Sequence, residues 1–457
     1  MALKIAIVVI VFILSTLLFK MAGETLSLTK LNMVSYIYYY FIAFNLLGGS
    51  LVYIGLREHY LIQKVRIPAT FDTTYGFIAY TAIAFPLVLL IVKKVIQMFN
   101  GKKVKSFIDS PTYYNSSRMN TQAVVIILTF VCLLSIVYVF YKMGFIPVLE
   151  MFRGRDLNLL RQMASRFFSG NQYIKNVVML QLTPMLSYYA YIHFRVEKGK
   201  TWTVLFIVLA LCSVVAVTYD FAKSPIITYI IGFYLIECIL GNIRNKKRFY
   251  TLAVAVVVII LFLYVGVMGY RDNLLNIYRG PIGRVLFTQI ATLFLHVEAF
   301  PLRHPFLNGA SFNSWMSFII PGAEGLRSGR VVMTIYNAAG VENQTAGVMN
   351  TLFIGEAYAN FGTAGVLIAP VLFGIIIGIF AYVLPGMKKR PSVVLLYVEM
   401  MLLFVTIVEG GFIDIIYNFT SIFYVVMFIC IDFFTGGSKY ARASNAFSRE
   451  KFLRPAK

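Results

Sequence analysis

Runs of apolar residues alternate with short polar stretches over nearly the whole chain. Most of these runs are roughly 17–25 residues long, which is the length that crosses a bilayer as a helix. Because the lipid interior offers the backbone no hydrogen-bond partners, such runs are expected to be helical. The pattern predicts eleven spans, at about 2–19, 32–55, 74–93, 122–141, 173–193, 202–219, 224–241, 250–268, 364–384, 393–409 and 411–433. We therefore expect an all-α integral membrane protein with about 11 transmembrane helices, forming a single polytopic domain over residues 1–457.

The composition agrees with this prediction. Hydrophobic residues make up 59% of the chain and charged residues 13%, which does not suit a soluble globular protein. The first apolar run, LKIAIVVIVFILSTLLF, has no small-residue cleavage site after it, so we interpret it as an anchor and not as a signal peptide. Four cysteines (Cys132, Cys212, Cys238 and Cys430) fall within predicted spans without metal or redox spacing, and we expect them to be packing residues.

The net charge of +22 arises largely from basic residues that cluster in four places. These are Lys93, Lys94, Lys102, Lys103 and Lys105; Arg244, Lys246, Lys247 and Arg248; Lys388, Lys389 and Arg390; and Lys439, Arg442, Arg449, Lys451, Arg454 and Lys457 in the tail. One topology places all four clusters in the cytoplasm, with the N-terminus outside and the C-terminus inside. The clusters therefore indicate membrane orientation and attraction to anionic lipid, and no nucleic-acid partner is expected.

With this topology, two outward-facing segments are long enough to carry function, at 142–172 and 269–363. Loops of this length are usually functional or disordered, and the second is too rich in Phe, Leu, Ile and Tyr to be disordered. Its stretches RVLFTQIATLFLHVEAF and SFNSWMSFIIPG predict short helices that lie against the membrane or re-enter it.

The first outer segment contains MFRGRDLNLLRQMASRFFSG, in which apolar residues recur at helical spacing. Four arginines, Arg153, Arg155, Arg161 and Arg166, lie on the polar side of this pattern or on its approach. They indicate either an interfacial helix or a phosphate-binding site, since the planar guanidinium matches phosphate oxygens. The outer turn VTYDFAKSPI adds Lys223, which either pairs with Asp220 or points into the outer cavity.

The second outer segment carries nearly balanced charge, which favours a mixed site over a simple electrostatic patch. Its arginines are Arg271, Arg279, Arg284, Arg303, Arg327 and Arg330, and its acids are Asp272, Glu298, Glu324, Glu342 and Glu356. Four acids lie within or beside spans, Glu237, Glu399, Glu409 and Asp432, and we interpret them mainly as contacts near water or within the bundle. The stretch GIIIG, Gly374 to Gly378, matches a helix-packing motif.

A lipid diphosphate fits an outward-facing pocket of this composition. The chain contains no GxxxxGK[ST], GxGxxG, HExxH or DxD pattern, so a nucleotide substrate is disfavoured and no metal or other cofactor is expected. Arginines would stabilise the charge on a departing diphosphate. The candidates for this role are Arg271, Arg279, Arg284, Arg153, Arg155, Arg161 and Lys223. A carboxylate or histidine would take the proton from an incoming sugar hydroxyl.

Two stretches carry a resemblance to a known family: FPLRHPFLNGASF, and FIGEAYANFGTAGVLIAP leading into a span. Together with the many spans and two outer segments, they resemble the bacterial O-antigen polymerases, the Wzy-class oligosaccharide repeat-unit polymerases. The motif match covers about 299–370, and related sequences commonly carry arginine where this chain has Lys223.

The resemblance implies a GT-C-like glycosyltransferase bundle in the bacterial cytoplasmic membrane, with its site facing the periplasm or the cell exterior. It implies transfer of a growing glycan from undecaprenyl diphosphate to the non-reducing end of another lipid-linked repeat unit. Donor and acceptor would both be undecaprenyl-diphosphate-linked oligosaccharides, and a separate protein would regulate chain length.

The second stretch places Glu356 and Asn360 among glycines and aromatics at the start of a span. Glu356 is a candidate general base, with His296 and His304 as alternatives, although Glu356 could equally brace the loop through backbone N–H groups. Candidate glycan-binding residues are Tyr358, Asn360, Arg327 and Arg330. Two other functions stay open: a flippase or transporter of lipid-linked oligosaccharide, which would usually contain internal repeats, and an O-antigen ligase.

Overall fold

The computed structural model describes residues 1–100, 104–115, 118–153, 160–161, 163–164, 168–220, 222–243, 250–251, 254, 258, 276–343, 345–435 and 440–442. Within these residues the chain is helical apart from turns, connecting segments and one small sheet. The sheet pairs β1 (Tyr113–Asn115) with β2 (Tyr440–Arg442) in antiparallel register. The prediction of a helical fold is confirmed, with these two short strands as the exception.

The chain forms two compact units, each built from separate stretches of sequence. The first comprises Met1–Val104, Tyr264–Leu384 and Leu403–Phe419, and the second comprises Lys105–Leu263, Pro385–Leu402 and Thr420–Lys457. The outer segment predicted at 269–363 therefore belongs to the first unit. The segment predicted at 142–172 belongs to the second unit.

Helices of the first unit come from the N-terminal part of the chain and from two later stretches, which residues of the second unit separate. They are α1 (Ala2–Gly23), η1 (Leu28–Lys30), α2 (Met33–Phe41), η2 (Ile42–Leu46), α3 (Leu47–Tyr53), η3 (Ile62–Lys64), α4 (Pro68–Asn100), α13 (Gly280–Gly283), η6 (Arg284–Thr288), α14 (Gln289–Ala299), η7 (Ser314–Phe318), α15 (Ser328–Tyr336), α16 (Ala338–Glu342), α17 (Phe353–Val383) and α19 (Ile413–Ile416). The short helices within 280–342 agree with the prediction for the second outer segment. Helix α17 begins eleven residues before the predicted span at 364–384, so its first part was expected to be loop.

Helices of the second unit, together with those at the unit boundaries, complete the chain. They are α5 (Val104–Asp109), α6 (Arg118–Met143), α7 (Pro147–Phe152), η4 (Ile174–Leu182), α9 (Thr183–Glu197), α10 (Lys200–Val217), α11 (Lys223–Ile239), η8 (Leu384–Gly386), α18 (Pro391–Val408) and α20 (Phe419–Thr435). Cys132, Cys212 and Cys238 are buried in this unit, as expected of packing residues, whereas Cys430 is exposed.

Seven helices among the described residues are long and apolar enough to cross a membrane. They are Ala2–Lys30, Pro68–Phe99, Thr121–Met143, Lys200–Val217, Phe353–Gly386, Pro391–Val408 and Ile413–Phe434, and each overlaps a predicted span. The predicted spans 32–55, 173–193 and 224–241 also fall on helical residues, which are shorter or contain π-helical turns. The span predicted at 250–268 lies almost wholly outside the described residues. The chain is thus a multi-pass membrane protein.

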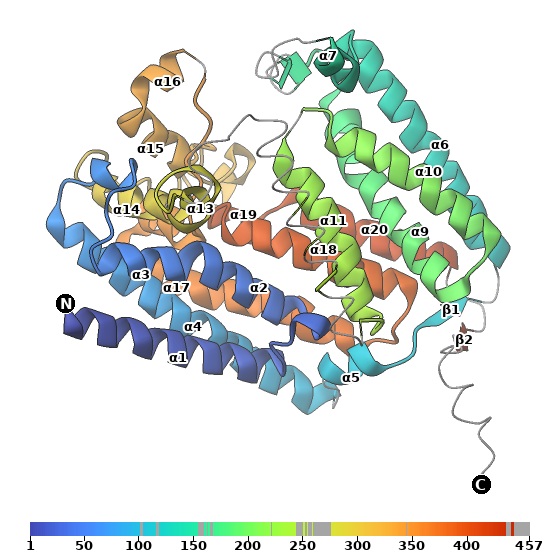
Figure 1. Cartoon of the computed structure of the whole chain (residues 1–457), viewed down its shortest axis with the longest axis horizontal. Helices are drawn as coiled ribbons and strands as arrows, with labels where there is room; N and C mark the ends of the chain where they lie inside the picture. Colours follow the sequence, from blue (N-terminus) through green and yellow to red (C-terminus); the bar gives the residue numbers. More distant parts are fainter. Residues whose placement is uncertain are drawn as a thin grey trace. The chain divides into compact units, whose positions relative to one another are not determined.

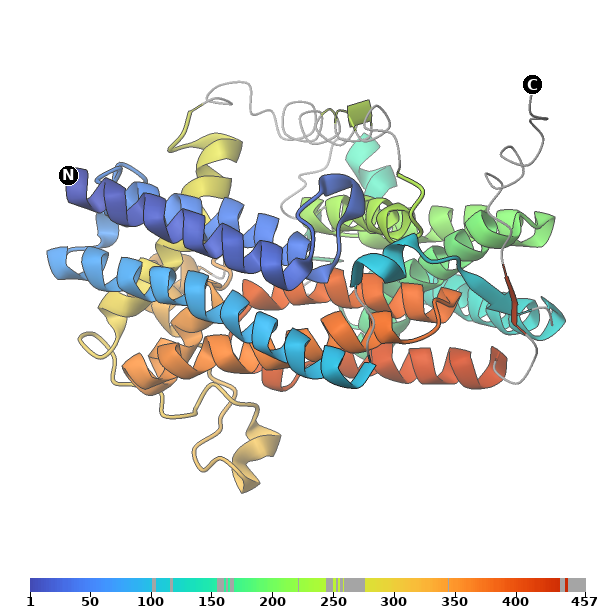
Figure 2. The same ribbon diagram turned by 90° about the horizontal axis from the view of Figure 1, so that it is seen from below.

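Helices α1, α4 and α17 run side by side in the first unit (Figures 1 and 2). Aromatic rings join them: Phe85 of α4 lies between Phe19 of α1 and Phe353 of α17, with ring centroids 5.9 and 6.2 Å away. The GIIIG stretch faces α4, because a β-carbon on Gly374 would lie 2.6 Å from Val88. Lipid gives helices little hydrophobic reason to associate, so such close packing is what holds them together.

The N-terminus and Lys93 lie at opposite ends of the first unit. Lys4 lies over the ring of Tyr53, at the end of α3, and forms an ion pair with Asp72 near the start of α4. At the far end of α4, Lys93 donates to the carbonyl of Met21, 2.7 Å away. The predicted topology places the N-terminus and Lys93 on opposite sides of the membrane, and which side faces outward stays a prediction.

Candidate functional site

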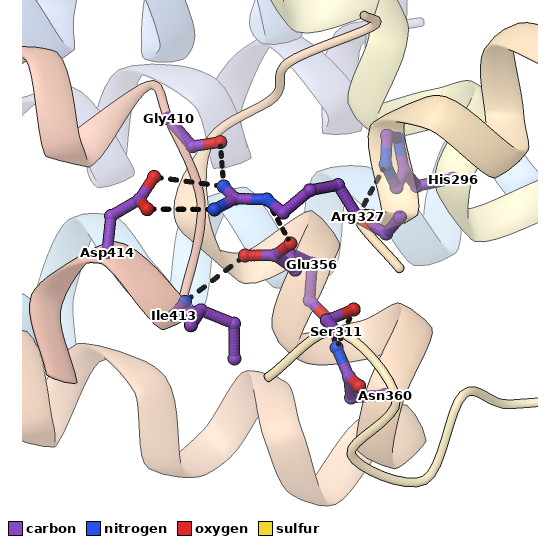
Figure 3. Close-up of polar contacts among 9 residues, drawn as sticks. His296, Ser311, Arg327, Glu356, Asn360, Gly410, Ile413 and Asp414 are labelled. Atoms are coloured by element: carbon purple, nitrogen blue, oxygen red, sulfur yellow. Dashed lines mark hydrogen bonds and ion pairs between the residues drawn. The ribbon is translucent and has the colours of Figure 1, made fainter. Parts of the chain in front are cut away.

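Two carboxylates of the first unit hold the guanidinium of Arg327, just before α15 (Figure 3). Its Nη1 and Nη2 contact the two oxygens of Asp414 at 2.8 and 2.9 Å. Its Nε lies 3.1 Å from Oε1 of Glu356, and Nη2 also donates to the carbonyl of Gly410 at 3.3 Å. The arginine is thereby fixed from three directions, because its planar donors engage several acceptors at once.

The backbone brings these side chains together at the first turns of two helices. Glu356 lies in the first turn of α17 and Asp414 in the first turn of α19, where carboxylates are favoured by unpaired N–H groups. The second oxygen of Glu356 accepts from the N–H of Ile413 at 3.1 Å. Glu356 therefore makes the bracing contact to backbone that its sequence position allowed, in addition to its contact with Arg327.

Gly411 permits the close approach of the Arg327–Glu356 pair to the turn that follows α18. A β-carbon at this position would lie 2.3 Å from Oε2 of Glu356 and 2.6 Å from Nη2 of Arg327. Real β-carbons do not approach other atoms so closely, so any other residue would displace the pair. The position of the ion pair therefore depends on glycine at residue 411.

Exposure distinguishes the two carboxylates. The side chain of Glu356 is 2% exposed, whereas those of Asp414 and Arg327 are 25% and 35% exposed. Hydrogen bonds to Asp414 raise the pKa of Arg327 above its ordinary value, so the guanidinium stays charged. Of the two acids, Asp414 is the one that a solvent-side ligand can reach.

Asp414 was not among the predicted site residues. A usable signal was present, since Asp414 lies just inside the predicted span 411–433, near the outer turn that separates it from the span 393–409, on the same predicted side as Glu356. Its partner could not be found in this way, because the pairing of Arg327 with Asp414 depends on tertiary structure.

Helix α17 is broken just after Asn360. Gly362 has φ 59° and ψ −146°, a conformation that is open to glycine and strained for other residues. At the break the carbonyls of Ala359 and Asn360 accept hydrogen bonds from the N–H groups of Leu307 and Asn308, at 2.9 and 3.1 Å. A loop of the predicted outer segment thus pairs with the backbone of the helix.

The side chain of Asn360 completes this pairing. Its oxygen accepts from the N–H of Gly309 at 3.1 Å, and its amide donates to Ser311 Oγ at 3.0 Å and to the carbonyl of Glu356 at 2.8 Å. The amide is fully buried and uses its nitrogen and its oxygen. Asn360, predicted to bind glycan, thus holds the 307–311 loop against α17 behind Glu356.

His296 lies buried beside Ser328, the first residue of α15. Its Nδ1 lies 2.7 Å from the carbonyl of Thr292 and must carry a proton, because a carbonyl can only accept. Burial lowers the pKa of His296 to about 4, so the ring is neutral and Nε2 accepts from Ser328 Oγ at 3.2 Å. His296 thus supports the helix that begins next to Arg327.

The side chains of the other predicted residues of this unit have other surroundings. His304 donates from Nδ1 to the carbonyl of Pro305 at 2.7 Å and packs edge-on against Phe300. Tyr358 lies between the rings of Phe77 and Phe306, 5.4 and 5.7 Å away. Arg330 is exposed.

Arg279 and Arg284 are both exposed, at the start of the helical segment formed by α13, η6 and α14. The backbone N–H of Arg279 donates to the side chain of Asn276 at 3.1 Å, which shapes the turn into this segment. Neither guanidinium forms an ion pair with another residue that the structure describes. These two cations are therefore available to an anionic ligand.

Among the predicted cations of the second unit, Arg153 pairs with Glu150 at 2.6 Å, and Arg161 lies within electrostatic range of Tyr219. Sequence reasoning missed Lys175, a buried cation 4.6 Å from the ring of Phe168 and near Asp220. A lysine near the start of a predicted span gave only a weak signal for this contact. Lys223 begins α11, but its side chain is not among those described, and Arg155, Arg166 and Arg271 lie outside the described residues.

In comparisons with known protein families, characterised proteins and solved structures, the chain has no match. Within the described part of the chain, no group of three or more His, Cys, Asp and Glu side chains is placed to hold a metal ion. The chemistry that these residues can support is proton transfer at Asp414 and anion binding at Arg279 and Arg284.

Proposed function

We propose that this chain is a membrane glycosyltransferase that polymerises oligosaccharide repeat units carried on a lipid diphosphate. One observation above all supports the proposal: the first unit contains exposed cations and, at a different position, a partly exposed carboxylate. Arg279 and Arg284 are exposed without an ion-pair partner among the described residues, whereas Asp414 is partly exposed and fixed by Arg327. Transfer from a lipid diphosphate needs cations for the leaving group and a carboxylate for the attacking hydroxyl.

Arg279 and Arg284 bind the diphosphate of the donor in this proposal. Both precede or begin a run of helix that continues to Ala299, and the start of a helix carries partial positive charge. Phosphate oxygens and guanidinium groups also match in geometry. The donor's lipid chain would remain in the bilayer, next to the spans of the same unit.

A short path of contacts leads from these arginines to the carboxylates. Gln289 lies five residues after Arg284, directly after the π-helical turn that Arg284 begins. Its amide donates to the carbonyl of Glu409 at 3.3 Å, and the next residue, Gly410, accepts from Arg327. The cationic and carboxylate groups are therefore joined by a path of contacts within the first unit.

Asp414 acts as the general base in this reaction. The acceptor hydroxyl attacks the anomeric carbon of the donor glycan, and its proton passes to the carboxylate of Asp414. The bond from the anomeric carbon to the diphosphate oxygen breaks, and its electron pair stays on the lipid diphosphate, where Arg279 and Arg284 stabilise the charge. Glu356 orients Arg327, which in turn orients Asp414.

Transport of a lipid-linked oligosaccharide is the second candidate. One observation favours it: α17 is broken at Gly362 within a candidate membrane span, and transporters often place substrate sites at broken helices. Ligase activity would use the same chemistry with a different acceptor.

The test uses purified protein in nanodiscs with the lipid-diphosphate-linked repeat unit extracted from its own source cells, with EDTA and without nucleotide sugar. A ladder of longer lipid-linked products, lost in Asp414→Asn, would support the polymerase. Unchanged substrate in nanodiscs, together with movement of the intact lipid between leaflets in proteoliposomes, would replace it with the transporter. Product formed only when lipid A core is added would identify a ligase.

A further inference from the structure

Glu409, at the end of α18, is a buried acid without an ion-pair partner among the described residues. The residue is 7% exposed, and its Oε1 accepts a hydrogen bond from the amide of Asn45, which is fully buried. Its Oε2 is buried and has no hydrogen-bond partner, and the same is true of Oδ1 of Asn45. One oxygen of each side chain in this hydrogen-bonded pair therefore lacks a donor, although the amide of Gln289 also interacts with the carboxyl group of Glu409.

The surrounding groups do not supply a positive charge for an ionised Glu409. Arg327 donates to the carbonyl of the adjacent Gly410, but it already faces two carboxylates, Glu356 and Asp414. The titratable group that interacts with Glu409 from α2 is the hydroxyl of Tyr40. The facing group on α14 is the neutral amide of Gln289. Three histidines also lie in this unit, and each has another partner: His296 contacts Ser328, His59 contacts Thr288 and His304 contacts the carbonyl of Pro305.

We propose that Glu409 binds a proton and forms a neutral carboxylic acid–carboxamide pair with Asn45. One proton supplies the donor that both unpartnered oxygens lack. An ionised carboxylate here would be buried without a cation, which is far more costly than a buried neutral acid. A metal cation in a protein usually takes at least four ligand atoms, and these two oxygens fall short of that number.

Two π-helical turns position the groups around this acid. Asn45 lies within η2 (Ile42–Leu46), and Gln289 directly follows η6 (Arg284–Thr288). The two turns pack against each other. A π-helical turn inserts one residue into a helix and re-aims the side chains after it, and such turns occur often at functional sites. Both insertions here direct an amide at Glu409.

The proton matters because Glu409 adjoins the Arg327 region. With the proton bound, Arg327 faces two carboxylates, and release of the proton would add a third negative charge one residue from Gly410. This inference does not depend on the proposed glycosyl transfer, since it concerns the charge state of the acid itself.

Infrared difference spectroscopy of the full chain in nanodiscs tests the proposal. At neutral pH, the spectrum of the native protein minus that of Glu409→Gln should contain the C=O stretch of a protonated carboxylic acid. Carboxylate bands in its place would overturn the proposal. If those bands shift when sodium is replaced by choline, a cation occupies the position; if they do not, an ionised and hydrated acid does.

Glu298 gives a matched control, because it is also buried but has four donors. Its oxygens accept from the N–H groups of Arg66 and Ile67 at 2.5 and 3.0 Å, from Arg303 Nη2 at 2.9 Å and from the hydroxyl of Tyr336 at 3.1 Å. Glutamine mimics a neutral acid and not a carboxylate. Glu409→Gln should therefore retain the thermal midpoint of the native protein at neutral pH, whereas Glu298→Gln should lower it. An equal loss in both variants would contradict the proton on Glu409.

Discussion

Arg327 and Asp414 are 87 positions apart in the sequence and form a two-pronged ion pair, with nitrogen–oxygen distances of 2.8 and 2.9 Å. The pair joins the start of α15 to the first turn of α19, and Glu356 contacts it from the side of α17. It gives each of the two acids a distinct role, and the first prediction separates those roles.

Asp414→Asn should lower glycosyl transfer by about 10²–10⁴-fold, the usual contribution of a general base, because it removes the charge that takes the proton. Glu356→Gln should instead lower the free energy of unfolding by about 1–3 kcal/mol, because its new NH₂ group replaces one carboxylate oxygen and then faces an N–H donor, either that of Arg327 or that of Ile413. Product ladders and thermal unfolding in nanodiscs measure the two effects. Glu342→Gln, an exposed acid of α16, is the control. Full activity in Asp414→Asn would remove Asp414 as the base.

Alanine at Arg279 and Arg284 together should abolish polymer formation while leaving the unfolding midpoint unchanged. Both side chains are exposed and lack an ion pair among the described residues, so the folded state loses no contact known for them. Arg303→Ala is the comparison, because Arg303 pairs with Glu298 at 2.9 Å and packs over the ring of Tyr336. That variant should lose stability. Normal polymer in the Arg279, Arg284 double variant would rule out these arginines as the diphosphate site.

Alanine scanning of three glycines should separate strain and collision from ordinary helix propensity. Gly362→Ala forces a side chain into a left-handed conformation, and Gly411→Ala collides with Glu356 and Arg327, so each should cost about 1–3 kcal/mol. Gly76→Ala, in α4, meets no atom within 4 Å and should be neutral or stabilising by up to about 1 kcal/mol. Chemical denaturation measures all three. A loss in Gly76→Ala as large as the others would show that the scan reports general sensitivity of the helices.

Acid should weaken the folded state through His296. Its pKa is about 4 in the folded protein, below the ordinary value of about 6.5 expected when unfolded. Between these values the unfolded chain binds the extra proton, so stability is complete above pH about 6.5 and falls as the pH drops towards 4, by at most about 3 kcal/mol. Unfolding midpoints from pH 7 to pH 4 measure this slope. The slope should become shallower in His296→Gln and persist in His304→Gln.

Trp315 should report the membrane interface. Its side chain is 52% exposed, in an uncharged stretch, and it packs against Tyr417 with ring centroids 4.8 Å apart. Trp and Tyr favour the headgroup region of a bilayer. The chain has two tryptophans, and Trp202 is 1% exposed, so Trp202→Phe leaves Trp315 as the single probe. Lipids brominated near the headgroup should quench its fluorescence more than aqueous iodide does. Quenching by iodide alone would place Trp315 in water.

The sequence predicted the helices well because run length and the backbone's need for hydrogen bonds allow few alternatives in lipid. Glu356 and Asn360 could be singled out because polar residues beside a span need a partner. Their partners could not, since the contacts to Ile413 and Gly309 depend on how α17 breaks. Lys389 illustrates the same limit: it was assigned to membrane orientation, but its buried Nζ donates to the carbonyls of Ile108 and Ser110 at 2.9 and 3.0 Å. Charge pattern alone does not reveal such a cap.

The break in α17 also constrains how this protein enters the membrane during synthesis. The carbonyls of Ala359 and Asn360 are paired with the N–H groups of Leu307 and Asn308, which the ribosome produces some fifty residues earlier. Lipid cannot supply those donors. We therefore expect the first part of α17 to reach its native conformation in the membrane only after the 307–311 loop lies beside it. An ordinary apolar helix, whose backbone groups pair within the helix, can insert into the bilayer alone.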